Sequence, residues 1–325
     1  TRGGTMKAGD NRWKDFPDYI LGITREIWED RGLTPKMKEY YHPDCVVRSP
    51  GGGVAVGEPQ MTALTFATLN TFPDRQLYGE DVIWTGDTDA GMLSSHRLYS
   101  EATHLGHGAF GPPTGKRLRF RIIADCFAHD GMISDEWLVR DNGAIVRQLG
   151  HAPEDWARAE LAAGRGTTPL TPASDRAGPY TGRGNDHPMG ARLADILTRM
   201  MAGDFAVIEE AYDRAAVLEY PGGASARSWQ GADRHWLPLM ASFPGAAFEI
   251  HHIIGRDDAD MAPRAAVRWS LTGTHDGPGP FGPATGAPVH IMGITHAEFG
   301  PWGLRREWTV YDEVAVWVQI VQGAG

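Results

Sequence analysis

The sequence repeats itself at a constant offset of 171 residues, as shown by His104 and His275 and by Trp137 and Trp308. The turn sequence Pro-Gly-Gly recurs at the same offset, at residues 50–52 and 221–223. A period of this length indicates two copies of a whole domain rather than the short units of a solenoid. The repeat therefore predicts one fold that occurs twice in the chain.

Two domains, at residues 12–151 and 188–323, and a linker at residues 152–187 follow from the repeat. A chain of 325 residues accommodates two domains, and each half is long enough to bury its own core. The linker is rich in Ala, Gly, Thr and Pro and has little apolar periodicity. Only its first third, residues 153–162, is expected to be helical.

Periodicity predicts the same order of elements in each copy: helix, helix, strand, helix, then a four-stranded meander. In the first copy we expect helices near 16–27, 34–41, 58–71 and 142–149 and strands near 45–47, 76–85, 90–104, 117–128 and 132–141. Helices gathered early and antiparallel strands gathered late predict an α+β fold. A bent sheet over helices leaves a hollow, which is where ligand sites prefer to form.

Composition excludes several classes of function. The net charge of −10 and the pI near 5.7 argue against nucleic acid and against an anionic membrane surface as partners. The sequence has no apolar run long enough to span a bilayer, and residues 1–14 form a polar arm without the apolar core of a signal peptide. Cys45 and Cys126 are expected to be reduced and buried, which predicts a cytoplasmic protein.

A glycine motif in each copy mimics a dinucleotide-binding fingerprint, as Gly106-x-Gly108-x-x-Gly111 and again at residues 277–282. That fingerprint must open a helix after a strand, so that the helix N-terminus faces a pyrophosphate. Here prolines and another strand follow, which predicts a hairpin loop. We therefore expect no nucleotide and no other cofactor.

Histidines near these loops raise the question of a metal site. His104 and His107 have a spacing that suits a metal, but the second copy keeps His275 and places Pro278 where His107 stands. Neither half supplies the three or four ligands that zinc requires, so no metal is predicted. His104 and His275 are either catalytic or structural groups that bond the loop backbone at a strand end.

Several segments resemble the SnoaL-like polyketide cyclase and ester cyclase family: residues 267–277 and 282–286 in the second copy, and residues 130–137 and 148–150 in the first. The resemblance implies an NTF2-like, cone-shaped α+β barrel in each half. Such domains usually pair through their sheets, so the resemblance also implies an intramolecular pseudo-dimer, which could pair again as a homodimer.

Acid–base groups are the candidates for catalysis, because no nucleophile motif is present. Asp125 stands alone in the apolar run 122–127, where a carboxylate is costly unless it faces a cavity or a partner. Its repeat equivalent is His296. The resemblance implies an aspartate in this strand that acts as general acid and base in an aldol ring closure. Counting from the preceding turn places that role at Ala124 instead, on the opposite face of the strand.

The alternative for Asp125 is a place in the interface between the sheets, paired with an arginine such as Arg119 or Arg121. The sequence alone does not decide between the cavity and the interface as the position of Asp125. The two positions differ in which face of the strand carries the carboxylate.

Substrate contacts are predicted at three further repeated positions: Tyr41 and Tyr212, Glu136 and Glu307, and Trp137 and Trp308. A phenol can donate a hydrogen bond to a carbonyl oxygen that gains charge, and a tryptophan can form an apolar wall. The alternative is a core tryptophan beside a solvated glutamate.

Three functions are consistent with these residues. The first is a cofactor-free aldol cyclase, isomerase or hydrolase that acts on a small apolar carbonyl compound of polyketide-like character. The second is a protein that binds a small hydrophobic ligand without converting it. The third is an assembly module that uses its sheets for partners.

Overall fold

The computed structural model describes residues 12–324, so most of the predicted N-terminal arm, residues 1–14, lies outside the described residues. The elements of the first half, in chain order, are α1 (Phe16–Trp28), α2 (Leu33–Tyr40), β1 (Tyr41–Ser49), β2 (Gly53–Val56), α3 (Gly57–Thr71), β3 (Gln76–Asp87), β4 (Gly91–Thr103), β5 (Arg117–His129), β6 (Met132–Arg140) and α4 (Asn142–Leu149). Helix α1 is capped at its N-terminus by Asp15, whose carboxylate accepts a hydrogen bond from the Asp18 N–H. Its buried face carries Ile20, Ile23 and Ile27, at the spacing of one helical stripe.

The second half repeats this order. Its elements are α6 (Pro188–Met201), α7 (Ala206–Ala211), β7 (Tyr212–Tyr220), β8 (Ala224–Arg227), α8 (Trp229–Ser242), β9 (Ala247–Arg256), β10 (Arg264–Thr274), β11 (Pro288–Gly300), β12 (Gly303–Tyr311) and α9 (Glu313–Gly323). The repeated Pro-Gly-Gly turns have the same conformation, because Gly51 has φ of 79° and Gly222 has φ of 78°. Positive φ at these positions favours glycine over other residues.

Each half contains one six-stranded sheet, in the order β2-β1-β6-β5-β4-β3 and β8-β7-β12-β11-β10-β9. All neighbouring strands are antiparallel except the pairs β1–β6 and β7–β12, which are parallel. The α+β fold in two tandem copies is confirmed. The expected closure into barrels is wrong, because in the described residues the edge strands β2 and β3, and likewise β8 and β9, are not paired with each other.

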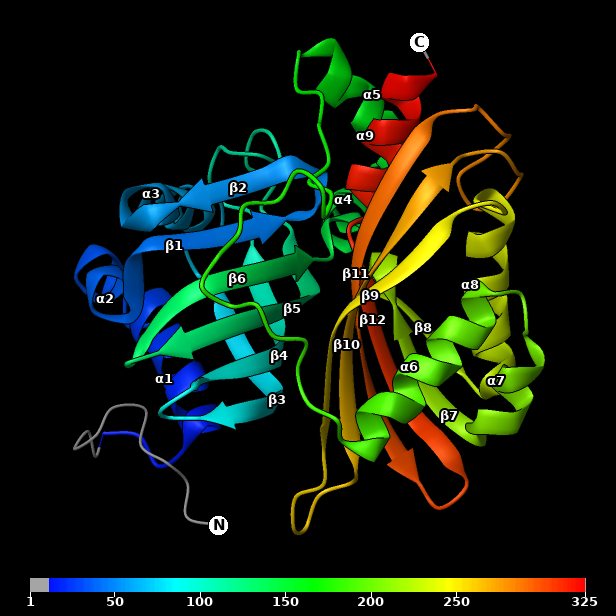
Figure 1. Ribbon diagram of the computed structural model, residues 1–325. Coiled ribbons are helices and arrows are strands. Elements are labelled where there is room, and N and C mark those ends of the chain that lie inside the picture. The colour runs from blue at the N-terminus through cyan, green and yellow to red at the C-terminus, as the bar shows by residue number, and fades with distance from the viewer. Residues whose placement is uncertain (1–11, 325) are drawn as a thin grey trace.

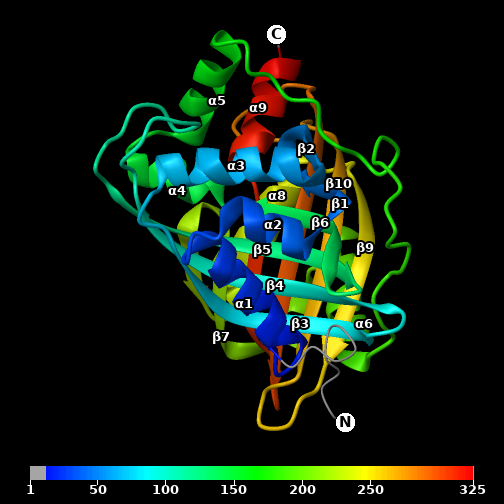
Figure 2. The same ribbon diagram turned by 90° about the vertical axis from the view of Figure 1, so that its left-hand side faces the viewer.

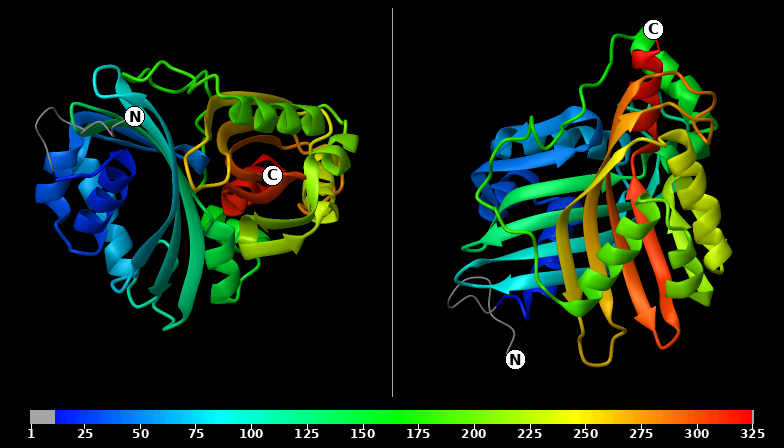
Figure 3. Two further views of the ribbon diagram at one scale, coloured as in Figure 1. Left: turned by 90° about the horizontal axis from the view of Figure 1, so that it is seen from below. Right: turned by 45° about the vertical axis from the view of Figure 1, so that its right-hand side comes forward.

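The two sheets lie back to back, and the helices α1–α3 and α6–α8 cover their outer faces (Figure 1). Strands of the first sheet run across those of the second, as seen when the molecule is turned (Figure 2). The view from below shows each sheet curving around its own helices (Figure 3). The faces that meet bury a small apolar cluster of Ile123, Val139, Ile294 and Val310.

The linker contains the expected helix, α5 (Pro153–Ala162), which packs against α9. Beyond it the chain runs along both domains. The backbone N–H of Tyr180 donates to Asp135 in the first half, and Gly184 forms a parallel bridge with Ile253 in the second. This part of the linker therefore contacts both sheets.

Cys45 and Cys126 are buried, and no disulfide joins them. Within the described part of the chain, no helix is both long enough and apolar enough to cross a membrane.

Candidate functional site

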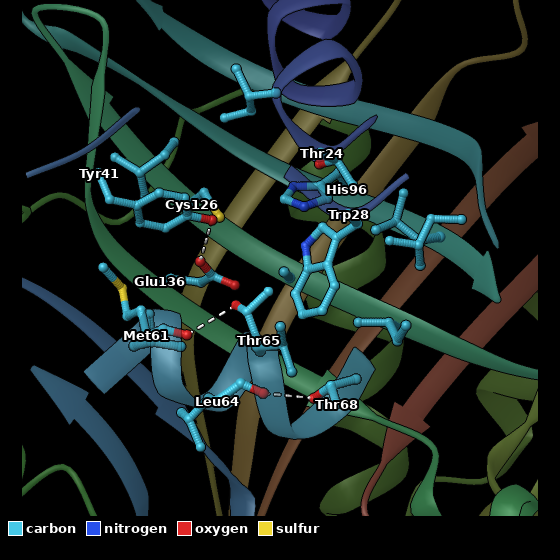
Figure 4. Close-up of a pocket in the computed structure, with 18 of the residues that line it drawn as sticks. Thr24, Trp28, Tyr41, Met61, Leu64, Thr65, Thr68, His96, Cys126 and Glu136 are labelled. Carbon is cyan, nitrogen blue, oxygen red and sulfur yellow. Dashed lines mark hydrogen bonds between the residues drawn. The ribbon is translucent and has the colours of Figure 1, made fainter. Parts of the chain in front are cut away.

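A cavity of about 250 Å³ lies in the first half, between helices α1–α3 and the inner face of the sheet. Figure 4 shows its polar side chains, among them Tyr41, His96, Cys126 and Glu136, pointing toward the space between α3 and the sheet. Leu64 on α3 lines the cavity and is also exposed, so the cavity reaches the surface beside this helix.

The register of the sheet decides which side chains enter the cavity. Ala124 and Cys126 of β5 line it, whereas Asp125 between them points to the opposite face, since side chains alternate along a strand. Cys126 is directly opposite Glu136 on β6, so the thiol and the carboxyl group share one face. The carboxyl group inside the cavity is therefore that of Glu136.

Glu136 is a buried carboxyl group with few partners. The Tyr41 hydroxyl donates to its Oε2 at 3.3 Å, and the thiol of Cys126 supplies a second hydrogen bond. Burial raises the pKa of Glu136 from 4.5 to about 7, and these two hydrogen bonds lower it only in part. At neutral pH this group can both accept and donate a proton.

The raised pKa predicts a specific dependence of stability on pH. Between about pH 4.5 and 7 the folded protein holds more protons at Glu136 than the unfolded chain does. The stabilisation from this site is therefore complete below pH 4.5 and is lost as pH rises through 7. As pH rises from 5 to 8, we expect Glu136→Gln to gain stability relative to the parent, by up to about 3 kcal/mol. Urea unfolding at pH 5 and pH 8 measures the change.

The control for this measurement is Glu210→Gln, which changes a glutamate on the exposed surface beside Arg199. Its stability relative to the parent should change little between the two pH values. A Glu136→Gln difference that is equally flat would contradict a protonated Glu136 in the folded protein.

His96 of β4 lies one row along the sheet from Glu136, opposite Ala124. Burial lowers the pKa of His96 to about 4, so the ring is neutral at physiological pH. Its Nδ1 lies 3.2 Å from the Ser94 hydroxyl. A neutral imidazole is a hydrogen-bond donor that suits a carbonyl oxygen without adding a charge to the cavity.

The corresponding hollow of the second half is filled. Trp236, Trp269 and Tyr220 stand at the positions of Thr65, Leu98 and Ser49, at the repeat offset of 171 residues. All three aromatic side chains are buried in the core of the second half. The Trp236 ring contacts the other two, with its centroid 5.9 Å from that of Trp269 and 6.4 Å from that of Tyr220. Larger side chains at equivalent positions thus replace the cavity by packed core.

Glu307, the equivalent of Glu136, is enclosed in this core and fully hydrogen-bonded. Its Oε2 accepts from the hydroxyls of Tyr212 at 2.7 Å and Tyr220 at 3.1 Å. Its Oε1 accepts from Trp236 at 3.2 Å and Thr309 at 2.8 Å. The two predicted contact pairs therefore differ: Tyr41 and Glu136 lie at a cavity, whereas Tyr212 and Glu307 form a closed network in the core.

Asp125 lies between the two sheets, outside the cavity. The Arg268 Nε donates to its Oδ2 at 3.0 Å, and the Nδ1 of His252 lies 3.5 Å from the same oxygen. Burial favours a higher pKa, but His252 and Arg268 outweigh it and lower the pKa of Asp125 to about 2. The carboxylate is held in an ion pair and does not line the cavity, which corrects the expectation that it moves protons there.

His296, the equivalent of Asp125, holds the reciprocal position. Its Nδ1 lies 3.0 Å from an Arg97 nitrogen and its Nε2 lies 2.7 Å from the Ser95 hydroxyl. Because arginine only donates, Nδ1 is the acceptor. Burial and the Arg97 charge hold the pKa of His296 well below its usual range, so the ring is neutral. It likewise does not line the cavity that holds Glu136.

Trp137 and Trp308 lie outside the cavity that holds Glu136, which corrects their predicted place beside that glutamate. Both face the other half of the chain, where Trp137 lines a separate pocket with Tyr180 and Arg268. The guanidinium of Arg268 lies 4.1 Å from the Trp137 ring, and that of Arg97 lies 3.5 Å from the Trp308 ring. Arg97 and Arg268 are themselves repeat equivalents. Each half therefore offers an arginine to a tryptophan, and to the residue at the position of Asp125.

Comparison with known proteins agrees with this duplicated architecture. Residues 19–149 match the family model described as SnoaL-like polyketide cyclase, and residues 193–307 match the model described as SnoaL-like domain. The chain is a tandem of two SnoaL-like domains. No curated protein matches it significantly.

Single-domain structures are similar to part of the chain. IdmH from Streptomyces antibioticus is 25% identical, with 42% of this chain and 98% of that chain covered and a TM-score of 0.36. A protein from Acidithiobacillus ferrooxidans is 24% identical, with 43% and 99% covered and a TM-score of 0.36.

The repeated histidines of the two SnoaL-like domains lie at strand ends and outside the cavity. The Nδ1 of His104 lies 3.2 Å from the Thr114 hydroxyl, and that of His275 lies 3.0 Å from the Thr285 hydroxyl. The backbone of His104 also accepts from the N–H groups of Thr114 and Gly115. These contacts fix the loop after the strand, which is the structural alternative considered for both residues.

The glycine motifs form loops between β4 and β5 and between β10 and β11, as predicted. In each loop the first residue of the turn pairs with the last, Gly108 with Gly111 and Gly279 with Gly282. Across residues 12–324, no group of three or more His, Cys, Asp or Glu side chains is arranged to hold a metal ion.

Sequence reasoning missed His96 as a cavity residue. Its repeat equivalent is Val267, so a comparison that selects polar residues present in both copies does not select His96. A polar residue that occurs in only one copy could have indicated it. Several residues of the cavity in the first SnoaL-like domain differ from their equivalents in the second.

Proposed function

We propose that the first SnoaL-like domain is a cofactor-free acid–base enzyme that removes a proton from carbon next to a carbonyl group, as an aldol cyclase or isomerase requires. The observation that carries this proposal is Glu136, a carboxyl group inside a cavity with a pKa raised to about 7. Membership of a polyketide cyclase family supports the same reaction class. The second domain then supplies structure rather than chemistry.

In this mechanism the Glu136 carboxylate accepts the proton from carbon, and the electrons of the C–H bond form an enolate. The neutral His96 ring donates a hydrogen bond to the enolate oxygen. Glu136, now protonated, returns the proton to carbon in an isomerisation or to the new alkoxide oxygen in a ring closure. Tyr41 holds the carboxyl group through its hydrogen bond to Oε2.

Exchange of carbon-bound hydrogen for deuterium tests this proposal without knowledge of the natural substrate. We expect the protein to catalyse exchange at the acidic C–H of small aryl ketones and 1,3-diketones in D₂O, followed by NMR. Glu136→Gln should lower the rate by about 10²-fold or more, because general-base catalysis contributes at least this much. Glu307→Asp in the packed domain should leave the rate of the folded protein unchanged.

The rate should also rise with pH through an apparent pKa near 7, as the Glu136 carboxyl group loses its proton. Exchange that persists in Glu136→Gln, or that shows no such inflection, would contradict this role. Absence of exchange in every carbonyl compound that raises the melting temperature would favour the second candidate, a binding protein that carries a small hydrophobic ligand.

We also propose that the tandem acts as an intramolecular pseudo-dimer. The reciprocal contacts of Arg97 and Arg268 support this arrangement, because an interface related by a two-fold axis uses the same residues from both sides.

A further inference from the structure

Two arginines reach the cavity from the end opposite Glu136. Arg140 lies on the same strand as Glu136, four residues further along and on the same face. Four residues of strand span about 13 Å. Arg75 joins it from the segment before β3, where its Nε donates to Ser100 of β4 at 3.2 Å. The cavity therefore has a carboxyl group at one end and two guanidinium groups at the other.

Neither guanidinium group is paired with a carboxylate in the described structure. Apart from the bond to Ser100, Arg75 only stacks on the rings of Trp28 and Phe120, at 4.7 and 5.8 Å. The Nε of Arg140 donates to the Asn142 side chain at 2.8 Å, which in turn donates to Asp312 at 2.6 Å. Asp312 thus stabilises the Arg140 charge from a distance, without a direct ion pair.

Burial of two unpaired cations in one place is unfavourable. Arg75 is 8% exposed, and burial together with the Arg140 charge lowers the pKa of Arg75 to about 9. A guanidinium group has five N–H donors, and most of those on these two residues find no protein acceptor among residues 12–324. An anion at this end of the cavity would satisfy the donors and offset both charges.

The packed domain supports a link between these arginines and the cavity. The repeat equivalents of Arg75 and Arg140 are Ala246 and Tyr311. Both cations are therefore absent from the copy in which aromatic side chains fill the equivalent hollow. By contrast, the arginines of the interface, Arg97 and Arg268, occur in both copies. The shared fold therefore does not require arginine at positions 75 and 140, since the second copy adopts the same fold without them.

We propose that the substrate is a small, elongated carboxylic acid, whose carboxylate binds Arg75 and Arg140 and whose carbonyl group lies near Glu136. Planar guanidinium groups bind a carboxylate through paired hydrogen bonds, which fixes its orientation. The apolar walls between the two ends, including Leu98 and Leu138, suit a hydrocarbon or aryl body. This inference rests on the proposed function for the identity of the reacting end only.

Binding of 4-benzoylbutyrate, a keto acid, and of its neutral primary amide tests the proposal by calorimetry on the full chain. We expect the acid to bind at least about tenfold more tightly than the amide. Arg75→Gln and Arg140→Gln should each remove this preference and leave amide binding almost unchanged. The matched control is Arg119→Gln, which changes an exposed arginine outside the cavity and should retain the preference.

Equal binding of acid and amide by the unmodified protein, or no binding of either, would overturn the proposal, and neither measurement depends on a variant that folds. A preference that survives both Arg75→Gln and Arg140→Gln would also overturn it. Glu136→Gln separates the two proposals, because it should keep the preference for the acid while it abolishes hydrogen exchange. If the protein prefers the acid but catalyses no hydrogen exchange, the carboxylate site stands and the proposed reaction fails. If it catalyses exchange but shows no preference for the acid, the reaction stands and the carboxylate site fails.

Discussion

Trp236→Thr is expected to lower the free energy of unfolding by about 3–5 kcal/mol, the usual cost of removing a large buried aromatic side chain. Trp236 is completely buried, packs against Trp269 and donates to the carboxyl group of Glu307. The substitution installs the residue that the first domain has at Thr65. It therefore removes packing and leaves one oxygen of Glu307 with a single donor.

Denaturant unfolding measures this loss, and Trp302→Thr is the matched control. Trp302 is 79% exposed in the turn between β11 and β12, so the same chemical change there should alter stability by less than about 0.5 kcal/mol. A loss of less than 1 kcal/mol in Trp236→Thr would show that the second hollow is not held closed by this side chain.

Arg268→Met is expected to cost about 3–5 kcal/mol, because it leaves the charge of Asp125 buried between the sheets without its ion pair. Asp125 is 1% exposed, and its Oδ1 already lacks a hydrogen-bond partner. His252 is the remaining basic group at the carboxylate, and protonation of its buried ring is unfavourable because burial lowers the pKa of His252.

The double variant Arg268→Met with Asp125→Leu should recover most of the loss, since an apolar pair of similar volume avoids the buried charge. Arg305→Met is the control: it removes a half-exposed partner of Glu298 at 3.3 Å and should change stability by about 1 kcal/mol or less. If the single variant at Arg268 is as stable as the parent, the ion pair does not hold the sheets together.

The order of elements was predictable because helical and strand periodicities are strong in both copies. Helices α1, α3 and α4 and strands β3–β6 lie where the spacing of apolar residues indicates them. Strand β2 was missed, because four residues after a glycine turn carry too little pattern. The open edges of each sheet follow from pairing between distant strands, which local sequence does not encode.

The site was harder to predict than the fold, because it depends on which face of a strand each residue occupies. Asp125 and Ala124 differ by one position, and the register with β6 places Ala124 in the cavity and Asp125 at Arg268. Nothing local to β5 fixes that choice. A search for residues common to both copies also selects for the shared interface, where Trp137 and Trp308 lie.

The covalent link between the two domains has a consequence for how such a site can evolve. In a homodimer every substitution appears twice, so a tryptophan that filled one cavity would fill the other as well. Fusion into one chain removes that constraint, and here Trp236 and Trp269 close one copy while Thr65 and Leu98 leave the other open. The second domain can therefore gain stability from a packed core, while the first retains a cavity with the buried charged groups that its chemistry requires.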